Sequence, residues 1–168
     1  MLYIDFDGVI LDTEELLFEE WRKNPNRYLL PESEKIRYVH DANWNFIINN
    51  SKVINDSLYY LKQMDPSKSF ILTKIHSEGN EGTEKIKWLR KNDIKQGIYL
   101  VPHKIKKTEI VDASGNALID DSLKNLQDWQ LAGGNSFFFD IDNDNIDSWG
   151  QFNKEGYKRV RSLEKFVK

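Results

Sequence analysis

Short runs of apolar residues alternate along this chain with longer segments in which apolar residues recur at helical spacing. The short runs predict strands over 1–6, 69–73, 97–101, 117–119, 136–139 and 157–160. The longer segments predict helices over 13–24, 51–63, 84–91 and 122–131, with mixed helical character over 32–49. Strands that alternate with helices in this way predict an α/β fold, a Rossmann-like three-layer sandwich around a central parallel sheet.

Polar side chains follow four of these strands. They are Asp5 and Asp7 after the first strand, Thr73 after the second, the lysines of 104–107 after the third, and Asp120 and Asp121 after the fourth. Ligands of open parallel sheets bind beyond the carboxyl ends of the strands. We therefore expect these side chains to gather in one crevice.

Such a group of residues predicts phosphoryl chemistry. Four neighbouring carboxylates cannot all ionise without a compensating cation. An oxygen-only ligand set suits Mg²⁺, which also binds substrate phosphates. A threonine hydroxyl and a lysine can hold a phosphoryl group, and an aspartate can form a covalent aspartyl phosphate. The predicted ligand is a small phosphorylated compound.

Composition narrows the classes of protein. Hydrophobic residues make up 39% and charged residues 30% of the 168 residues, a balance typical of a globular domain. The net charge of −3 lacks the basic footprint of a nucleic-acid binder. There is no cysteine, which excludes thiolate chemistry. We expect no membrane span and no signal peptide, and hence a cytoplasmic location.

Four segments resemble the motifs of haloacid dehalogenase-like (HAD) hydrolases, in the order of that family. The first is Asp5-Phe6-Asp7-Gly8-Val9-Ile10-Leu11-Asp12-Thr13, and the second is Phe70-Ile71-Leu72-Thr73. Lys107 resembles the third-motif lysine, and Leu118-Ile119-Asp120-Asp121 resembles the fourth motif. The ordered set spans most of the chain, which makes the resemblance specific.

The resemblance implies a role for each matching residue. Asp5 is the nucleophile and a metal ligand, and Asp7 is the general acid and base whose backbone carbonyl also binds the metal. Thr73 and Lys107 bind the phosphate, together with Gly8 and Lys74. Asp120 ligates Mg²⁺, and Asp121 does so directly or through water. An acid at Asp7 favours phosphatase over dehalogenase chemistry.

The identity of the phosphate-binding lysine stays open at this point. Lys104, Lys106 and Lys107 are candidates, with Lys85 and Lys87 as outside possibilities. We prefer Lys107, because the Lys107-Thr108 pair before the Asp-Asp strand resembles the deoxyribonucleotidase branch of the family. His76 and His103 follow strands, so either could approach a substrate, although solvated loop histidines are the preferred interpretation.

The resemblance also implies a domain division. Residues 14–50 are expected to form a small helical cap that selects the substrate, and 1–13 with 51–168 to form the catalytic core. The large aromatic residues of the cap are expected to pack its helices more often than to stack on a nucleobase. Residues 140–150 read as an acidic, Asn-rich surface loop.

The sequence thus predicts a magnesium-dependent phosphatase that hydrolyses a small phosphomonoester, with nucleoside or deoxynucleoside monophosphates as first choice. The first alternative is a sugar-phosphate mutase of the same superfamily. A non-enzymatic phosphoacceptor is the second, although the order of the acids differs from that of receiver domains. A degenerate scaffold is the third, and the intact set of acids argues against it.

Overall fold

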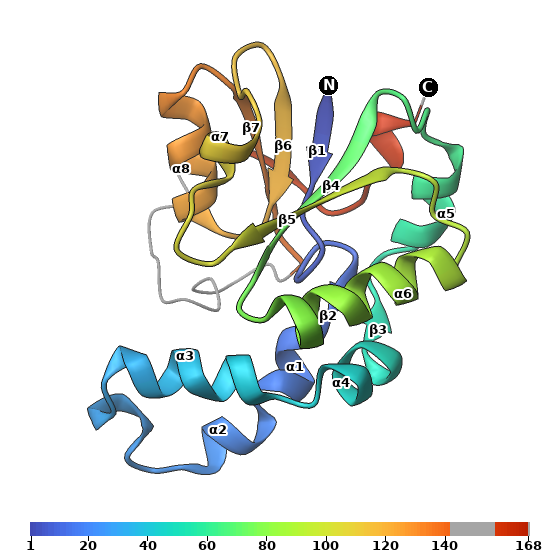
Figure 1. Ribbon diagram of the computed structural model, residues 1–168. Helices are drawn as coiled ribbons and strands as arrows, with labels where there is room; N and C mark the ends of the chain where they lie inside the picture. Colours follow the sequence, from blue (N-terminus) through green and yellow to red (C-terminus); the bar gives the residue numbers. More distant parts are fainter. Residues whose placement is uncertain (142–156, 168) are drawn as a thin grey trace.

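The computed structural model describes residues 1–141 and 157–167, and within them a parallel sheet forms the centre of the molecule (Figure 1). Its strand order is β5-β4-β1-β6-β7-β8, and every neighbouring pair is parallel. The strands are β1 (Leu2–Ile4), β4 (Ser69–Ile75), β5 (Gly97–Pro102), β6 (Ala117–Asp120), β7 (Asn135–Phe139) and β8 (Lys158–Val160). The predicted α/β fold with a central parallel sheet is confirmed.

Helices cover both faces of the sheet, as a three-layer sandwich requires. On one face lie α5 (Ser57–Gln63) and α6 (Thr83–Lys91), and on the other α7 (Lys107–Ile110) and α8 (Leu123–Leu131) (Figure 1). Successive strand residues point to opposite faces. Ile4 and Ile119 therefore belong to the core under α5 and α6, while their neighbours Tyr3 and Leu118 pack against α8. A short helix η3 (Glu164–Phe166) follows the last strand.

The segment between β1 and α5 forms a helical layer beyond the carboxyl ends of the strands (Figure 1). It consists of α1 (Thr13–Leu17), α2 (Glu19–Lys23), η1 (Arg27–Leu29), α3 (Glu32–Asp41) and α4 (Trp44–Asn50). A two-stranded antiparallel ribbon of β2 (Leu11–Asp12) and β3 (Lys52–Val53) joins this layer to the rest. The segment has the place expected of a cap, and its role in selecting a substrate stays a prediction.

Aromatic side chains hold this helical layer together. Trp44 is buried and its indole N–H donates to the Val39 carbonyl (2.9 Å). Phe18 stacks on Tyr38, with 6.4 Å between the ring centroids, and the Tyr38 hydroxyl donates to the Leu17 carbonyl. These contacts agree with the interpretation that the aromatic residues pack helices.

Several predicted helix boundaries were wrong. The helix expected over 51–63 begins only at Ser57, because Lys52–Val53 pairs as a strand and Asn55 and Asp56 adopt positive φ angles (40° and 56°) that no helix accommodates. The helix expected over 13–24 is interrupted at Phe18. Between β4 and α6 the chain forms a π-helical turn, η2 (Glu78–Gly82).

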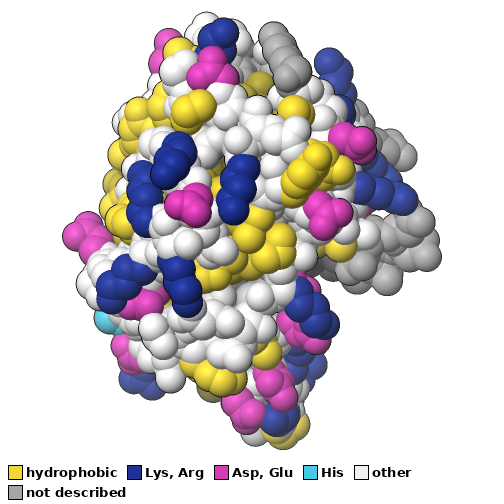
Figure 2. All heavy atoms as spheres, turned by 90° about the vertical axis from the view of Figure 1, so that its right-hand side faces the viewer, with side chains coloured by type: hydrophobic (Ala, Val, Ile, Leu, Met, Phe, Trp, Pro, Cys, Tyr) yellow, Lys and Arg dark blue, Asp and Glu magenta, His cyan; other side chains and the backbone are white. Residues whose placement is uncertain are grey.

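Surface features add two observations. On the face shown in Figure 2, basic and acidic side chains are interspersed with hydrophobic ones. No helix in the described ranges is long and apolar enough to cross a membrane.

Asp140, at the start of the expected acidic loop, is buried. The rest of that expected loop, from residue 142, lies outside the described residues.

Candidate active site

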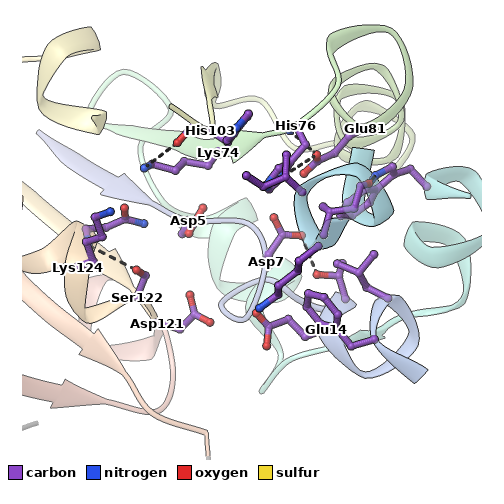
Figure 3. A pocket seen from close by; sticks show the side chains of 18 of the residues that line it. Asp5, Asp7, Glu14, Lys74, His76, Glu81, His103, Asp121, Ser122 and Lys124 are labelled. Carbon is purple, nitrogen blue, oxygen red and sulfur yellow. Dashed lines mark hydrogen bonds and ion pairs between the residues drawn. The ribbon is translucent and has the colours of Figure 1, made fainter. Parts of the chain in front are cut away.

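A cavity of about 280 Å³ lies between the carboxyl edge of the sheet and the helical layer (Figure 3). The sheet side contributes Asp5, Asp7, Lys74 and Asp121, whose side chains surround one space in Figure 3. The helical side contributes both apolar and polar groups. The apolar ones are Leu17, Phe18, Ile36, Val39 and Trp44, and the polar ones are Thr13, Glu14, Glu32 and Lys35. The structure therefore brings together acids as far apart in the chain as Asp5 and Asp121.

Asp5 lies directly after β1, lines the cavity and is 6% exposed. Its Oδ1 accepts hydrogen bonds from the Phe6 backbone N–H (2.8 Å) and pairs with Lys107 Nζ (3.1 Å). Among the described residues, none donates to Oδ2, which leaves that atom for a ligand. Burial raises the pKa of Asp5 to about 7; the charge of Lys107 opposes this rise, whereas Asp120 adds to it.

Lys107 is the lysine that the structure brings to the acids. Its Nζ lies 2.7 Å from Asp120 Oδ2 as well as 3.1 Å from Asp5, and its side chain is 1% exposed. Burial alone lowers the pKa of Lys107, but Asp120 and Asp5 raise it above its usual range. Lys106 instead pairs with Asp128 on the surface, and Lys104 is exposed. Of the three candidates, only Lys107 is placed to act at Asp5.

Asp120 is saturated with protein partners. Its Oδ1 accepts from the Ser122 backbone N–H (2.8 Å) and from Asn125 Nδ2 (3.2 Å), and its Oδ2 accepts from Asn125 Nδ2 (3.1 Å) and Lys107 Nζ. A carboxylate offers about four lone-pair sites, so these contacts occupy all of them. Asp120 is therefore better placed to orient Lys107 than to give an oxygen to a metal.

Asp121 is the acid that most needs a cation. Burial raises its pKa well above the usual value, and repulsion from Asp120, Glu14 and Asp5 adds to the rise. Oxygens of Asp5, Asp120 and Asp121 lie within 4.8 Å of one another. Asp5 and Asp121 have carboxylate oxygens without a protein donor among the described residues, and such oxygens suit Mg²⁺. The residues present thus fit the predicted metal.

Gly8 shapes the metal side of the cavity. Its φ of +69° lies in the left-handed region, which favours glycine. A β-carbon at this position would lie 2.1 Å from Asp121 Oδ2. The glycine of the first motif is therefore needed for the backbone turn and for the close approach of Asp121.

Asp7 lines the cavity and is held there by two hydrogen-bond donors. Thr13 Oγ1 donates to its Oδ1 (2.7 Å), and Lys85 Nζ donates to its Oδ2 (2.5 Å). The Asp7 side chain remains 26% exposed, so it stays open to the cavity. Lys85 also contacts Thr73 Oγ1 (3.1 Å), which places the second-motif hydroxyl next to this network.

Sequence reasoning missed the roles of Lys85 and Glu81. Lys85 was an outside candidate for the phosphate lysine, yet it contacts Asp7 and Thr73 rather than Asp5. Glu81, whose Oε1 lies 2.7 Å from Lys85 Nζ, was not considered. The available signal was their spacing of four residues, which suits a Glu–Lys pair on one helical face.

The upper wall of the cavity holds a lysine and two histidines. Lys74 Nζ donates to the His103 carbonyl (3.4 Å), and burial together with Lys107 and Lys124 lowers its pKa (Figure 3). His76 and His103 stack with 4.7 Å between ring centroids, and both line the cavity. They are thus packed against each other rather than solvated loop residues, because the ends of β4 and β5 are neighbours in the sheet.

Comparisons with known proteins identify the fold. No family model and no curated protein matches the chain by sequence. Solved structures match over nearly its whole length. YfnB of Bacillus subtilis, a proposed HAD hydrolase bound to magnesium, has a TM-score of 0.58 at 17% identity, covering 98% of this chain and 95% of that one.

Two further structures agree. A Thermotoga maritima protein proposed to be a β-phosphoglucomutase has a TM-score of 0.63 at 15% identity, covering 99% of this chain and 95% of that one. A Lactobacillus plantarum protein proposed to be a phosphoglycolate phosphatase has a TM-score of 0.60 at 12% identity, covering 99% and 96%. The chain therefore has the fold of HAD-superfamily hydrolases.

Proposed function

We propose that this chain is a HAD-like phosphatase that hydrolyses a small phosphomonoester through an aspartyl phosphate on Asp5. The observation that carries the proposal is the position of Asp5. It is buried, paired with Lys107 at 3.1 Å, and opens into a cavity that Asp7 and Asp121 also line. The shared fold supports the same class of chemistry, since YfnB is described as a HAD hydrolase.

In the first half of the reaction, Asp5 Oδ2 attacks the phosphorus atom. The bond between phosphorus and the ester oxygen breaks, and Asp7 gives its proton to the departing alkoxide oxygen. Lys107 places a fixed positive charge beside the phosphoryl group, and the Thr73 hydroxyl donates a hydrogen bond to one of its oxygens. An alcohol leaves, and Asp5 is phosphorylated.

In the second half, Asp7 acts as the base. It takes a proton from a water molecule, whose oxygen attacks the phosphorus atom while the bond from phosphorus to the Asp5 oxygen breaks. Inorganic phosphate leaves, Asp5 returns to its carboxylate and Asp7 is again protonated. One side chain can serve both halves because it lies two residues from the nucleophile and borders the same cavity.

The Mg²⁺ ion of this proposal would be held by the carboxylates of Asp5 and Asp121 and the backbone carbonyl of Asp7. When bound, it offsets the negative charge of the phosphoryl group and of the neighbouring acids. Asp120 supports the site by orienting Lys107. This division of roles refines the sequence interpretation, in which Asp120 is itself a ligand.

The proposed substrate is a small organic phosphate, with nucleoside or deoxynucleoside monophosphates as the first compounds to test. The cavity of about 280 Å³ is near the lower end of the range of roughly 300–1,000 Å³ for ligand pockets, which favours a small compound. Its apolar wall of Leu17, Val39 and Trp44 could contact the non-phosphate part of the substrate. The resemblance of Lys107-Thr108 to the deoxyribonucleotidase branch is the basis for nucleotides.

The test is phosphate release from a broad panel of nucleotides, sugar phosphates and other phosphomonoesters, with Mg²⁺ and with a chelator. Asp5→Asn is nearly isosteric and cannot form the aspartyl phosphate. We expect Mg²⁺-dependent release by the wild type and none by Asp5→Asn. If folded wild type releases no phosphate from any compound, the proposal is wrong.

A phosphomutase is the second candidate, favoured by the similarity to the Thermotoga maritima protein proposed to be a β-phosphoglucomutase. Such an enzyme would return the phosphoryl group from Asp5 to another hydroxyl of the sugar instead of to water. Conversion of one sugar phosphate isomer into another without phosphate release would identify this activity.

A further inference from the structure

Lys85 is a fully buried charged group that the mechanism above does not use. Its side chain is 0% exposed. The rings of Phe6 and Trp44 lie beside its Nζ, each with 5.4 Å from Nζ to the ring centroid. Burial alone lowers the pKa of Lys85, but Asp7 and Glu81 raise it above its usual range. The side chain is therefore a permanent cation with a fixed position.

The partners of this cation connect two parts of the site. Its Nζ lies 2.5 Å from Asp7 Oδ2, 3.1 Å from Thr73 Oγ1, 3.0 Å from the Lys74 carbonyl and 2.7 Å from Glu81 Oε1. Glu81 is in turn fixed by the His76 backbone N–H, which donates to its Oε2 (2.7 Å). Two acidic side chains thus pair with Lys85. Both border the cavity, but the Asp7 side chain is 26% exposed and that of Glu81 only 2%.

An ammonium group only donates hydrogen bonds, and this has a consequence for Thr73. The Thr73 oxygen accepts from Lys85, so the Thr73 hydrogen points elsewhere. The Lys74 carbonyl, at 3.3 Å, is the acceptor within reach, and it also accepts from Lys85. The Thr73 side chain is itself buried and is not among those that line the cavity. A ligand oxygen that reached this hydroxyl would offer its hydrogen a better acceptor than the shared carbonyl does.

We propose that Lys85, braced by Glu81, is a positioning residue that holds the Asp7 carboxylate toward the reacting oxygen and sets Thr73 as a donor to the phosphoryl group. This inference rests on the proposed phosphatase function. Thr13 holds the other oxygen of Asp7 from the opposite side, so the carboxylate is fixed between two donors. Two groups of the reaction are thereby ordered by one side chain that does not touch the substrate.

The leaving group provides the test, because a merely structural lysine would not distinguish between substrates. An alkyl phosphate needs the proton of Asp7 to release its alkoxide, whereas 4-nitrophenyl phosphate releases a stable anion without it. Lys85→Met keeps the length of the side chain and removes its donors. We expect its kcat to fall about 100-fold or more with an alkyl phosphate, the range for a lost general acid.

With 4-nitrophenyl phosphate the same variant should release nitrophenolate in a burst equivalent to the enzyme present. The burst is expected because Asp5 still attacks, while Asp7 no longer activates water well, so the aspartyl phosphate accumulates. Lys85→Arg retains a donor and a charge and should recover part of kcat with the alkyl substrate. Lys87→Met is the matched control, since Lys87 lies on the same helix, is exposed and pairs with Glu84 on the surface.

Lys85→Met leaves Glu81 buried without its cation and could unfold the protein. The double variant Glu81→Gln with Lys85→Met removes both charges and keeps the fold testable by thermal unfolding. It should show the same burst. Two results would overturn the inference. One is a folded double variant that loses kcat equally with both substrates and shows no burst, and the other is wild-type kinetics in Lys85→Met. An inactive wild type would instead overturn the proposed function on which the inference depends.

Discussion

Asp121 Oδ2 lies 2.1 Å from the point where a β-carbon of residue 8 would lie, so Asp121 can hold its position only because residue 8 is a glycine. Asp121 also has a pKa well above its usual value, because it is buried beside other acids. The glycine of the first motif and the last acid of the fourth motif therefore form one structural unit, on the side of the cavity where a cation is needed.

The first prediction concerns Gly8→Ala. The new methyl group must displace Asp121, and the left-handed backbone adds a cost of about 1–2 kcal/mol. We expect Mg²⁺ binding, measured by titration calorimetry, to fall at least tenfold. Gly115→Ala is the matched control: φ is +71° and nothing lies within 4 Å of the added carbon, so it should lose similar stability but bind Mg²⁺ as the wild type does. Equal loss of Mg²⁺ binding in both variants would contradict the explanation.

The second prediction separates the two acids of the fourth motif. Asp121→Asn removes a charge that other acids repel, so the metal-free protein should become more stable while its stabilisation by Mg²⁺ disappears. Asp120→Asn should destabilise the protein by about 3–5 kcal/mol. The asparagine amide leaves Lys107 without a charged partner and places an N–H group where the carboxylate accepts from Lys107 and Asn125. Thermal unfolding with Mg²⁺ and with chelator measures both effects. If Asp120→Asn were as stable as the wild type and only lost Mg²⁺ binding, Asp120 would be the ligand after all.

The third prediction identifies the phosphate lysine. Lys107→Met breaks a buried ion pair with Asp5 and Asp120, and should lower kcat/KM for the best phosphomonoester by at least 100-fold. It should also cost about 3–5 kcal/mol of stability. Lys106→Met removes only a surface pair with Asp128 and should change either quantity little. Steady-state kinetics and denaturant unfolding decide between them, and an inactive Lys106→Met would reverse the assignment.

The fourth prediction is a pH dependence of the metal-free protein. The pKa of Asp5 rises from 3.8 to about 7 on folding, so the folded state binds this proton more tightly than the unfolded state. The resulting stability is complete below pH 3.8 and is lost as the pH rises toward and through 7. In chelator, the free energy of unfolding of the wild type relative to Asp5→Asn should therefore fall between pH 5 and about pH 8. A constant difference over this range would show that Asp5 is not perturbed.

Much of the fold and of the candidate site could be predicted from local patterns. Strand residues such as Ile71 and Leu118 lie in short apolar runs. Asp5 directly follows β1, Asp120 ends β6, and Thr73 lies near the carboxyl end of β4. The parallel sheet then brings them to one edge without any further information. This is why sequence reasoning could expect Asp5, Asp7 and Asp121 to border one cavity, as they do.

Lys85 could not be found in this way. It lies in a helix among other lysines. A sequence does not show that its partners are Asp7, which follows β1, and Thr73, which lies in β4. The helix over 51–63 was misplaced for a related reason, since its first residues pair with Leu11 and Asp12 from a distant segment. Contacts between distant segments override local helical patterns at both places.

The most direct test of the central claim is to trap phosphate on the protein during turnover. The wild type and Asp5→Asn would be mixed with a ³²P-labelled form of the best substrate and Mg²⁺, quenched in acid within the first turnover, and digested. We expect label on the peptide that contains Asp5, with the base lability of an acyl phosphate, and none in Asp5→Asn. Hydrolysis by the wild type without a labelled peptide, together with activity retained in Asp5→Asn, would contradict the proposed role of Asp5.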